Sequence, residues 1–90
     1  MGNYIISDNY LFLKSENKVS ITSVDPTDNG IYELEDVAAE MFLRLVESKS
    51  TPTEVVSYIE ACYQMNKKII ETDLKALIDY LVHEQIIVEI

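Results

Sequence analysis

The sequence predicts a small α+β protein in which the strands come first and the helices follow. Residues 10–34 alternate apolar and polar side chains between clusters of turn formers, whereas residues 36–84 repeat apolar residues with helical spacing. Ninety residues provide one hydrophobic core, so residues 1–90 are expected to form a single domain. We therefore expect an antiparallel sheet of three strands with one face on three helices.

Three strands are predicted before the helices. Residues 10–14 and 19–24 are the first two strands, joined by a polar turn, and the second alternates apolar and small polar residues. The pair Asn29-Gly30 predicts a hairpin turn, because both residues tolerate positive φ. Residues 30–34 are then a short third strand. A short strand after a hairpin turn is a candidate sheet edge, with backbone groups open to a partner.

Three helices and a short extended tail (residues 86–88) are predicted next. The first spans about 36–46, with Asp36 either as its cap or within its first turn. Thr51-Pro52-Thr53-Glu54 is a capping box that begins the second helix. The third runs from Asn66 to about Glu84. The expected buried stripes are Val37, Ala38, Met41, Phe42, Leu45 and Val46; Val55, Val56, Ile59, Cys62 and Tyr63; and Ile70, Leu74, Leu77, Ile78 and Leu81.

The charge of the chain restricts its partners. Sixteen acidic and seven basic residues give a net charge of −9, and the acidic residues are spread along the whole sequence. This charge disfavours nucleic acid and anionic membranes as partners. A single cysteine excludes an internal disulfide, and no signal peptide or membrane span is visible. A cytoplasmic location is expected.

The sequence offers little for catalysis or metal binding. Cys62 and His83 are the only residues of their types, and we interpret them as a core residue and a solvated helix end rather than a nucleophilic pair. Zinc lacks ligands, and there is no glycine-rich phosphate loop. Asp25-x-Thr27-x-Asn29-Gly30 is similar to a calcium loop, but the hairpin turn is the favoured interpretation. No enzyme activity, cofactor or metal is expected.

Two binding roles remain for comparison. The second and third predicted helices form a possible helix-turn-helix, but the acids of the third outnumber its lysines, so DNA is disfavoured. The other role is peptide binding at the third strand. Ala76, Tyr80 and His83 share a second face of the third helix, and Ile31 and Tyr32 lie on the third strand. The alternative is that Tyr32 and Tyr80 simply complete the core with hydrated hydroxyls.

Several segments in a fixed order resemble the PqqD-like family. These are residues 19–34 followed by Glu35-Asp36-Val37-Ala38-Ala39-Glu40-Met41-Phe42, then 51–56, and then 73–81. The resemblance covers about residues 10–90. Two departures are Glu35, where the family usually has asparagine, and Gln85, where a glycine usually closes the third helix. We expect Asp36 to cap in place of the asparagine and Gln85 to adopt a strained turn.

The resemblance implies a winged-helix-like domain called a RiPP recognition element. Such a domain is a non-catalytic chaperone that binds the leader of a ribosomally synthesised precursor peptide and presents it to a modifying enzyme or leader peptidase. The lasso-peptide type is favoured. The leader adds a strand at the third strand, against the third helix. The implied peptide-binding residues are Gly30, Ile31, Tyr32, Glu33, Leu34, Asp73, Ala76, Leu77, Tyr80 and His83.

A second hypothesis from the composition is an acidic protein-interaction module of winged-helix shape, either antitoxin-like or a mimic of nucleic acid. This module would bind a basic protein with an affinity that falls steeply with salt. Strand addition into an apolar groove is expected to survive moderate salt.

Overall fold

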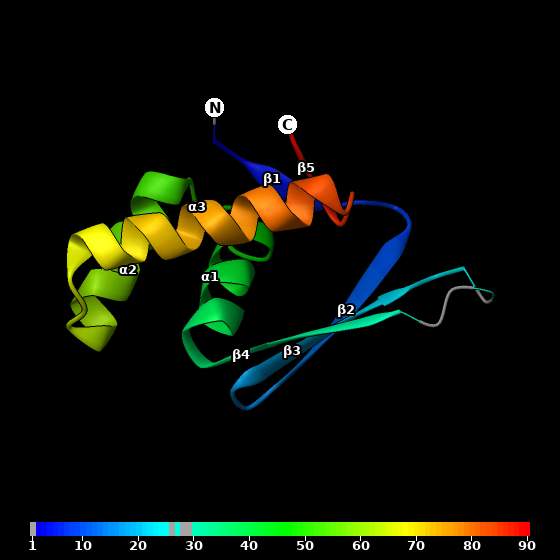
Figure 1. Cartoon of the computed structure of the whole chain (residues 1–90), viewed down its shortest axis with the longest axis horizontal. Helices are drawn as coiled ribbons and strands as arrows, with labels where there is room; N and C mark the ends of the chain where they lie inside the picture. The colour runs from blue at the N-terminus through cyan, green and yellow to red at the C-terminus, as the bar shows by residue number, and fades with distance from the viewer. Residues whose placement is uncertain (1, 26, 28–29) are drawn as a thin grey trace.

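The chain folds into a group of three helices from which a three-stranded sheet extends (Figure 1). The computed structural model describes residues 2–25, 27 and 30–90. The elements in order are β1 (Tyr4–Ile6), β2 (Tyr10–Ser15), β3 (Lys18–Ser23), β4 (Ile31–Glu35), α1 (Asp36–Val46), α2 (Pro52–Tyr63), α3 (Lys67–His83) and β5 (Ile87–Glu89). The predicted α+β order of three strands and three helices is confirmed.

The sheet has the order β2-β3-β4 and is antiparallel throughout. Ile21 at its centre lies opposite Phe12 on one side and Tyr32 on the other, and all three side chains belong to or pack against the core. The other face exposes three large apolar side chains, namely Leu11, Leu13 and Ile31. The third predicted strand is β4, and it is an edge strand as expected.

Two backbone hydrogen bonds show which way the amides of β4 point. The N–H of Asp36 donates to the C=O of Asn17 at 2.9 Å, and that of Val24 donates to Asn9 at 2.9 Å. Hydrogen-bonded pairs alternate along an antiparallel ladder. The two bonds agree on which residues of β3 direct their backbone groups to β4 and which direct them to β2. Tyr32 and Leu34 therefore direct their backbone groups to β3. Those of Ile31 and Glu33 point to the open edge.

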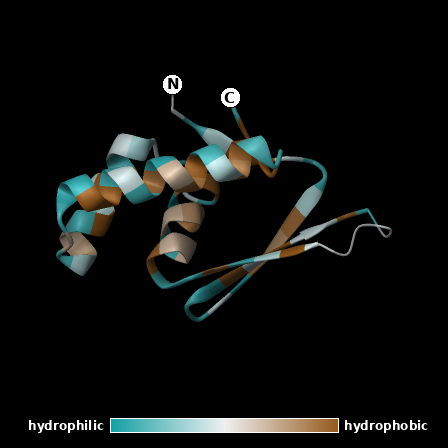
Figure 2. Cartoon of the chain, viewed as in Figure 1, coloured by the Kyte–Doolittle hydropathy of each residue, from teal (hydrophilic) through white to brown (hydrophobic). Residues whose placement is uncertain are grey.

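The core lies where α1 meets the inner face of the sheet and the other two helices. Met41, Phe42 and Leu45 of α1 are at most 2% exposed, and Phe42 meets Phe12 edge to face at 5.2 Å. Along α3, hydrophobic and hydrophilic residues alternate at helical spacing (Figure 2). This banding gives α3 one buried side, with Ile70, Leu74 and Leu81, and leaves its other sides exposed.

The three predicted helix starts are confirmed, and two of them have the predicted side-chain caps. Thr51 and Glu54 form the reciprocal capping box of α2, and Asn66 caps α3 by accepting from the N–H of Lys68. Of the two positions expected for Asp36, the cap is wrong, since no side chain caps α1, and the first turn is confirmed. Asp36 lies instead in the first turn with a φ of 54°, a conformation that aspartate tolerates better than most residues.

The predicted burial of Cys62 and Tyr63 is also wrong. Cys62 is exposed and Tyr63 is 42% exposed, whereas Val55, Val56 and Ile59 of the same helix are buried. The physical reason is that the last turn of α2 extends beyond the elements that cover its earlier turns, at the end of the molecule away from the sheet (Figure 1). The apolar stripe therefore continues past the edge of the core.

A second, two-stranded sheet joins the two ends of the described chain. β1 pairs antiparallel with β5, with Ile5 opposite Val88 and Ile6 opposite Ile87. The extended tail at 86–88 is thus confirmed as β5, one residue later than predicted, whereas β1 was not predicted. Strand β1 covers the helices on the side away from the large sheet (Figure 1).

Helix α3 ends in a Schellman motif closed by a residue other than glycine. The N–H of Ile86 donates to the C=O of Leu81 and that of Gln85 to Val82, at 2.9 and 3.0 Å. Gln85 has a φ of 61°, so the strained turn expected at this position is confirmed. This turn directs residues 86–89 back along the helices to meet β1.

The predicted turn at residues 25–30 is described only in part, because Pro26, Asp28 and Asn29 lie outside the described residues. Asp25 accepts from the N–H and the hydroxyl of Thr27 in a local turn. Within residues 2–25, 27 and 30–90, no group of three or more His, Cys, Asp or Glu could hold a metal ion. No helix in the same residues is long and apolar enough to cross a membrane.

Candidate functional site

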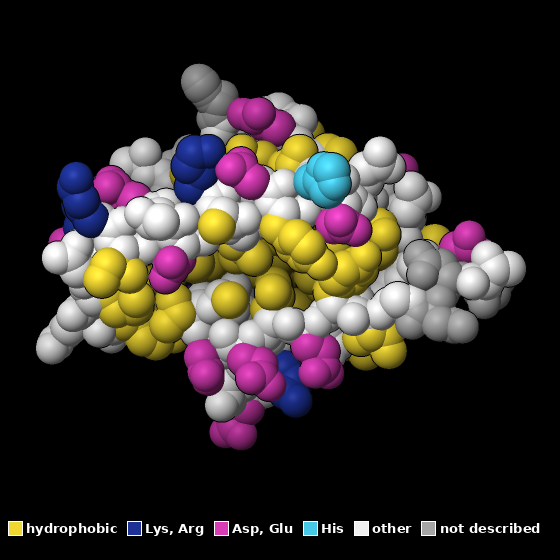
Figure 3. All heavy atoms as spheres, in the orientation of Figure 1, with side chains coloured by type: hydrophobic (Ala, Val, Ile, Leu, Met, Phe, Trp, Pro, Cys, Tyr) yellow, Lys and Arg dark blue, Asp and Glu magenta, His cyan; other side chains and the backbone are white. Residues whose placement is uncertain are grey.

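A hollow separates β4 from α3 on the face of the molecule in Figure 3, and hydrophobic side chains gather within it. Helix α1 packs against both elements and so lies beneath the space between them. We call this hollow the β4–α3 groove. Its half-buried apolar side chains come from β4 (Tyr32 and Leu34), α1 (Val37) and α3 (Leu77).

One side of the groove is the open edge of β4. All five residues predicted there lie together at the start of and along this strand: Gly30, Ile31, Tyr32, Glu33 and Leu34. Tyr32 and Leu34 face the core side, whereas Ile31 (63% exposed) and Glu33 face outward. The outward backbone groups of Ile31 and Glu33 offer the donors and acceptors that an added strand needs.

The other side of the groove is one face of α3. Asp73, Ala76, Leu77 and Tyr80 recur at helical spacing on this face, with Leu77 half-buried and Tyr80 45% exposed. His83, the remaining predicted residue, lies exposed at the last position of the helix. The ring of Tyr80 meets that of Tyr32 at 6.1 Å, which brings the two predicted sides of the groove into contact.

Two residues at this face were not predicted. Ile69 is 54% exposed and precedes Asp73 by one helical turn, and its spacing of four from Asp73 is a signal that could have identified it. Glu84, the C-cap of α3, accepts a 3.2 Å hydrogen bond from the hydroxyl of Tyr32. Its role depends on a contact across 52 residues, which no local pattern reveals.

Three tyrosines close the end of the groove near the C-terminus of α3. Tyr10 and Tyr32 meet at 6.3 Å, and Tyr32 in turn meets Tyr80. The hydrogen bond to Glu84, followed by desolvation and the nearby negative charge, raises the pKa of Tyr32 to about 12. The hydroxyl of Tyr32 is therefore held by a carboxylate. Tyr32 packs against the core, whereas Tyr80 is 45% exposed.

The structure does not bring Cys62 and His83 together. Cys62 lies near the start of α3, because only Gln64, Met65 and Asn66 separate α2 from α3, whereas His83 ends α3. A helix rises 1.5 Å per residue, so the length of α3 separates them by roughly 25 Å. These two residues cannot act as a nucleophile and its base.

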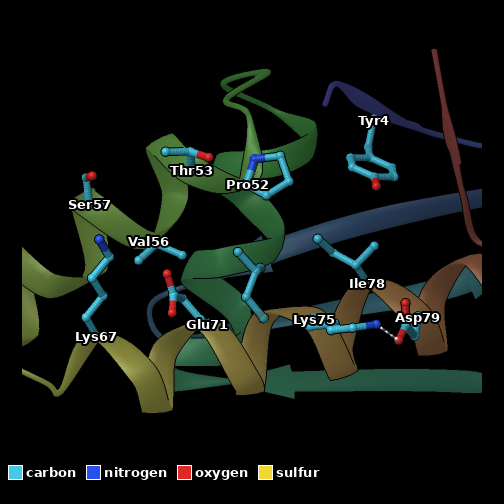
Figure 4. Close-up of a pocket in the computed structure, with 11 residues that line it drawn as sticks. Tyr4, Pro52, Thr53, Val56, Ser57, Lys67, Glu71, Lys75, Ile78 and Asp79 are labelled. Carbon is cyan, nitrogen blue, oxygen red and sulfur yellow. Dashed lines mark hydrogen bonds and ion pairs between the residues drawn. The ribbon is translucent and has the colours of Figure 1, made fainter. Parts of the chain in front are cut away.

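A second cavity of about 470 Å³ lies on the opposite side of α3, against α2 and β1 (Figure 4). Apolar side chains such as Val56 and Ile78 point into it, with Tyr4 at one end. Its charges cancel, since two lysines face two acids and Lys75 is bound to Asp79 at 3.0 Å. Nothing in this balance selects a charged ligand. The β4–α3 groove remains the better candidate because it alone adjoins the open backbone of β4.

Comparison with known proteins agrees with the fold. The model of the family described as "Coenzyme PQQ synthesis protein D (PqqD)" matches residues 23–87. The structure titled "TbiB1 in Complex with the TbiA(beta) Leader Peptide" superposes with a TM-score of 0.80 at 22% identity, over 91% of this chain and 92% of that one. The structure titled "Lasso peptide synthetase B1 complexed with the leader peptide" superposes with a TM-score of 0.82 at 16% identity, over 97% of this chain and 99% of that one. The search of curated proteins found no match.

Proposed function

Because the chain belongs to the PqqD family, we propose that it is a non-catalytic protein that binds the leader of a ribosomally synthesised precursor peptide. The observation that carries the proposal is the open edge of β4 directly beside the apolar β4–α3 groove. An extended peptide needs both features, since backbone hydrogen bonds supply affinity and side-chain pockets supply selectivity.

The binding mode follows from the alternation of β4. The leader forms a fourth strand of the sheet by bonding to the outward N–H and C=O groups of Ile31 and Glu33. Side chains alternate along that strand, so every second one enters the groove between Tyr32, Leu77 and Tyr80. The other leader side chains lie on the outer face of the sheet, in line with Ile31 and Glu33.

The solved relatives support the class of ligand. Both are described as complexes with a leader peptide, and one is described as lasso peptide synthetase B1. We assign this chain to the same lasso-type role, in which the bound precursor is presented to a modifying enzyme or leader peptidase. Presentation accelerates the reaction by raising the effective concentration of the substrate near that enzyme.

Fluorescence anisotropy tests the proposal directly. The probe is a labelled synthetic leader from a short precursor peptide, to be identified among the genes beside this one, and it is titrated with the purified protein. We expect saturable binding that an unlabelled leader competes away and that persists at moderate salt. Absence of binding at about 100 μM protein would overturn the proposal.

The alternative hypothesis, an acidic protein-interaction module, is based on the net charge of −9. It differs from leader binding in its salt response, because surface charge pairs are screened beyond about 10 Å at 0.1 M salt. A basic protein partner whose affinity collapses with salt, with no leader binding, would favour this alternative. The two functions therefore give opposite results in the same titration series.

A further inference from the structure

Glu33 is an acid at the open edge of β4 with no basic partner among the described residues. Its carboxylate projects on the outer face of the sheet, opposite Ser20 of β3, and the next residue across that row is Leu13. The two lysines of the neighbouring strands are bound elsewhere, Lys18 to Glu35 at 3.8 Å and Lys14 to Glu47 at 2.8 Å. Within the described part of the chain, no ion pair reaches Glu33.

A strand added at β4 would bring a side chain next to this carboxylate. Residues directly opposite each other in paired strands project on the same face, with Cβ atoms about 5 Å apart. The backbone groups of Glu33 point to the added strand, so the leader residue opposite Glu33 is fixed by the same hydrogen bonds that hold the leader. Opposite charges at such positions stabilise the pair, and like charges destabilise it.

We propose that Glu33 selects leaders that place a lysine or arginine opposite it on the outer face of the added strand. This inference rests on the proposed function and deepens it by naming the class of leader sequence. The neighbouring outward position, beside Ile31, accepts an apolar side chain. The expected leader segment thus carries an apolar and a basic residue two positions apart, alternating with the residues that enter the groove.

The alternative explanation for Glu33 is protection of a sheet edge. Charged residues on exposed edges prevent unwanted pairing between chains. Protection requires a charge of either sign and predicts no relation between Glu33 and the sequence of a bound peptide. The two explanations therefore differ in whether reversal of the charge at residue 33 reverses the preferred charge in the ligand.

A displayed library of random peptides is the probe for this test. The wild-type protein and the variants Glu33→Lys, Glu33→Gln and Glu16→Lys are each used for selection, and the enriched peptides are compared position by position. Glu16→Lys is the matched control, because it changes the net charge equally at an exposed site in the β2–β3 turn, which lies by Glu35 and Asp36 at the C-terminal end of β4 and not at the edge position of Glu33. Circular dichroism checks that each variant is folded.

We expect wild type and Glu16→Lys to enrich lysine or arginine at one position of the peptide, Glu33→Lys to enrich aspartate or glutamate there, and Glu33→Gln to show no preference. Exchanging the charge in one selected peptide changes its Kd about two- to fivefold. Peptides that bind with no charge preference, or a preference that Glu16→Lys reverses equally, overturn the role of Glu33 but leave leader binding intact. Failure of every variant to select a peptide overturns the proposed function and this inference together.

Discussion

The hydroxyl of Tyr32 on β4 donates a 3.2 Å hydrogen bond to Oε1 of Glu84 at the C-terminus of α3. The bond ties the edge strand to the helix across the end of the β4–α3 groove, where the ring of Tyr32 also meets Tyr80. Both sides of the proposed leader site are therefore held in a fixed relation by one phenol and one carboxylate.

This contact predicts a pH dependence of stability at alkaline pH. The pKa of Tyr32 is raised from 10.0 to about 12 in the folded protein, so the folded state retains a proton that the unfolded chain releases. The stabilisation of the folded state that comes from this raised pKa is complete below pH 10 and is lost as the pH rises towards 12. Urea unfolding across that range should show a smaller loss for Tyr32→Phe than for wild type. Equal losses in both proteins would contradict the pKa shift.

The direction of the amides in β4 predicts that proline at one position lowers stability and that proline at the adjacent position weakens leader binding. Tyr32→Pro removes an N–H that faces β3 and should destabilise the protein by about 1–3 kcal/mol or more. Glu33→Pro removes an N–H that faces the open edge, where proline is tolerated, and should leave the fold intact while weakening leader binding. Thermal unfolding and anisotropy measure the two effects.

Glu33→Gln is the control for the second variant, since it keeps the N–H and removes the charge. Leader binding by Glu33→Pro equal to that of Glu33→Gln would show that the outward amide makes no bond to the leader. Stability of Tyr32→Pro equal to wild type would show that the alternation of the ladder is reversed.

Much of the fold could be predicted because its signals are local. The capping box at Thr51 and Glu54 and the cap at Asn66 are read from adjacent residues, and they fix the starts of α2 and α3. Pairing of β1 with β5 could not be predicted, since Tyr4 and Glu89 lie at opposite ends of the sequence. Cys62 was assigned to the core because periodicity shows which side of a helix is apolar but not where its cover ends.

Some features of the candidate site could likewise be predicted from the sequence, and others could not. Ile31 and Tyr32 of β4 and the face of α3 with Ala76 and Tyr80 follow from period and order, whereas Asp73 is implied only by the family resemblance. Glu84 was missed because its role depends on a tyrosine brought next to it by the fold. The direction of the backbone groups of β4 requires the register of the sheet, which the sequence does not contain.

Tyr80 is predicted to matter for binding more than for stability. Its side chain is 45% exposed on the groove side of α3, so Tyr80→Ala should change the free energy of unfolding by about 1 kcal/mol or less. Leader affinity should fall clearly, since exposed tyrosines are common anchors in binding sites. Val82→Ala is the control, because Val82 is 43% exposed on the same helix outside the groove face. Unchanged leader affinity in Tyr80→Ala would show that the groove is misplaced.

Gln85 offers a gain in stability at the end of α3. With a φ of 61°, it adopts a left-handed conformation that costs an L-residue about 1–2 kcal/mol and glycine little. Glycine loses more conformational entropy on folding, which offsets part of this gain. We therefore expect Gln85→Gly to stabilise the protein by about 0.5–1 kcal/mol in urea unfolding. The same change at Val82, within the helix, should destabilise it. Because Gln85 turns the chain towards β5 rather than towards the groove, leader affinity should stay unchanged in Gln85→Gly, and a loss of stability there would contradict the strain assigned to this turn.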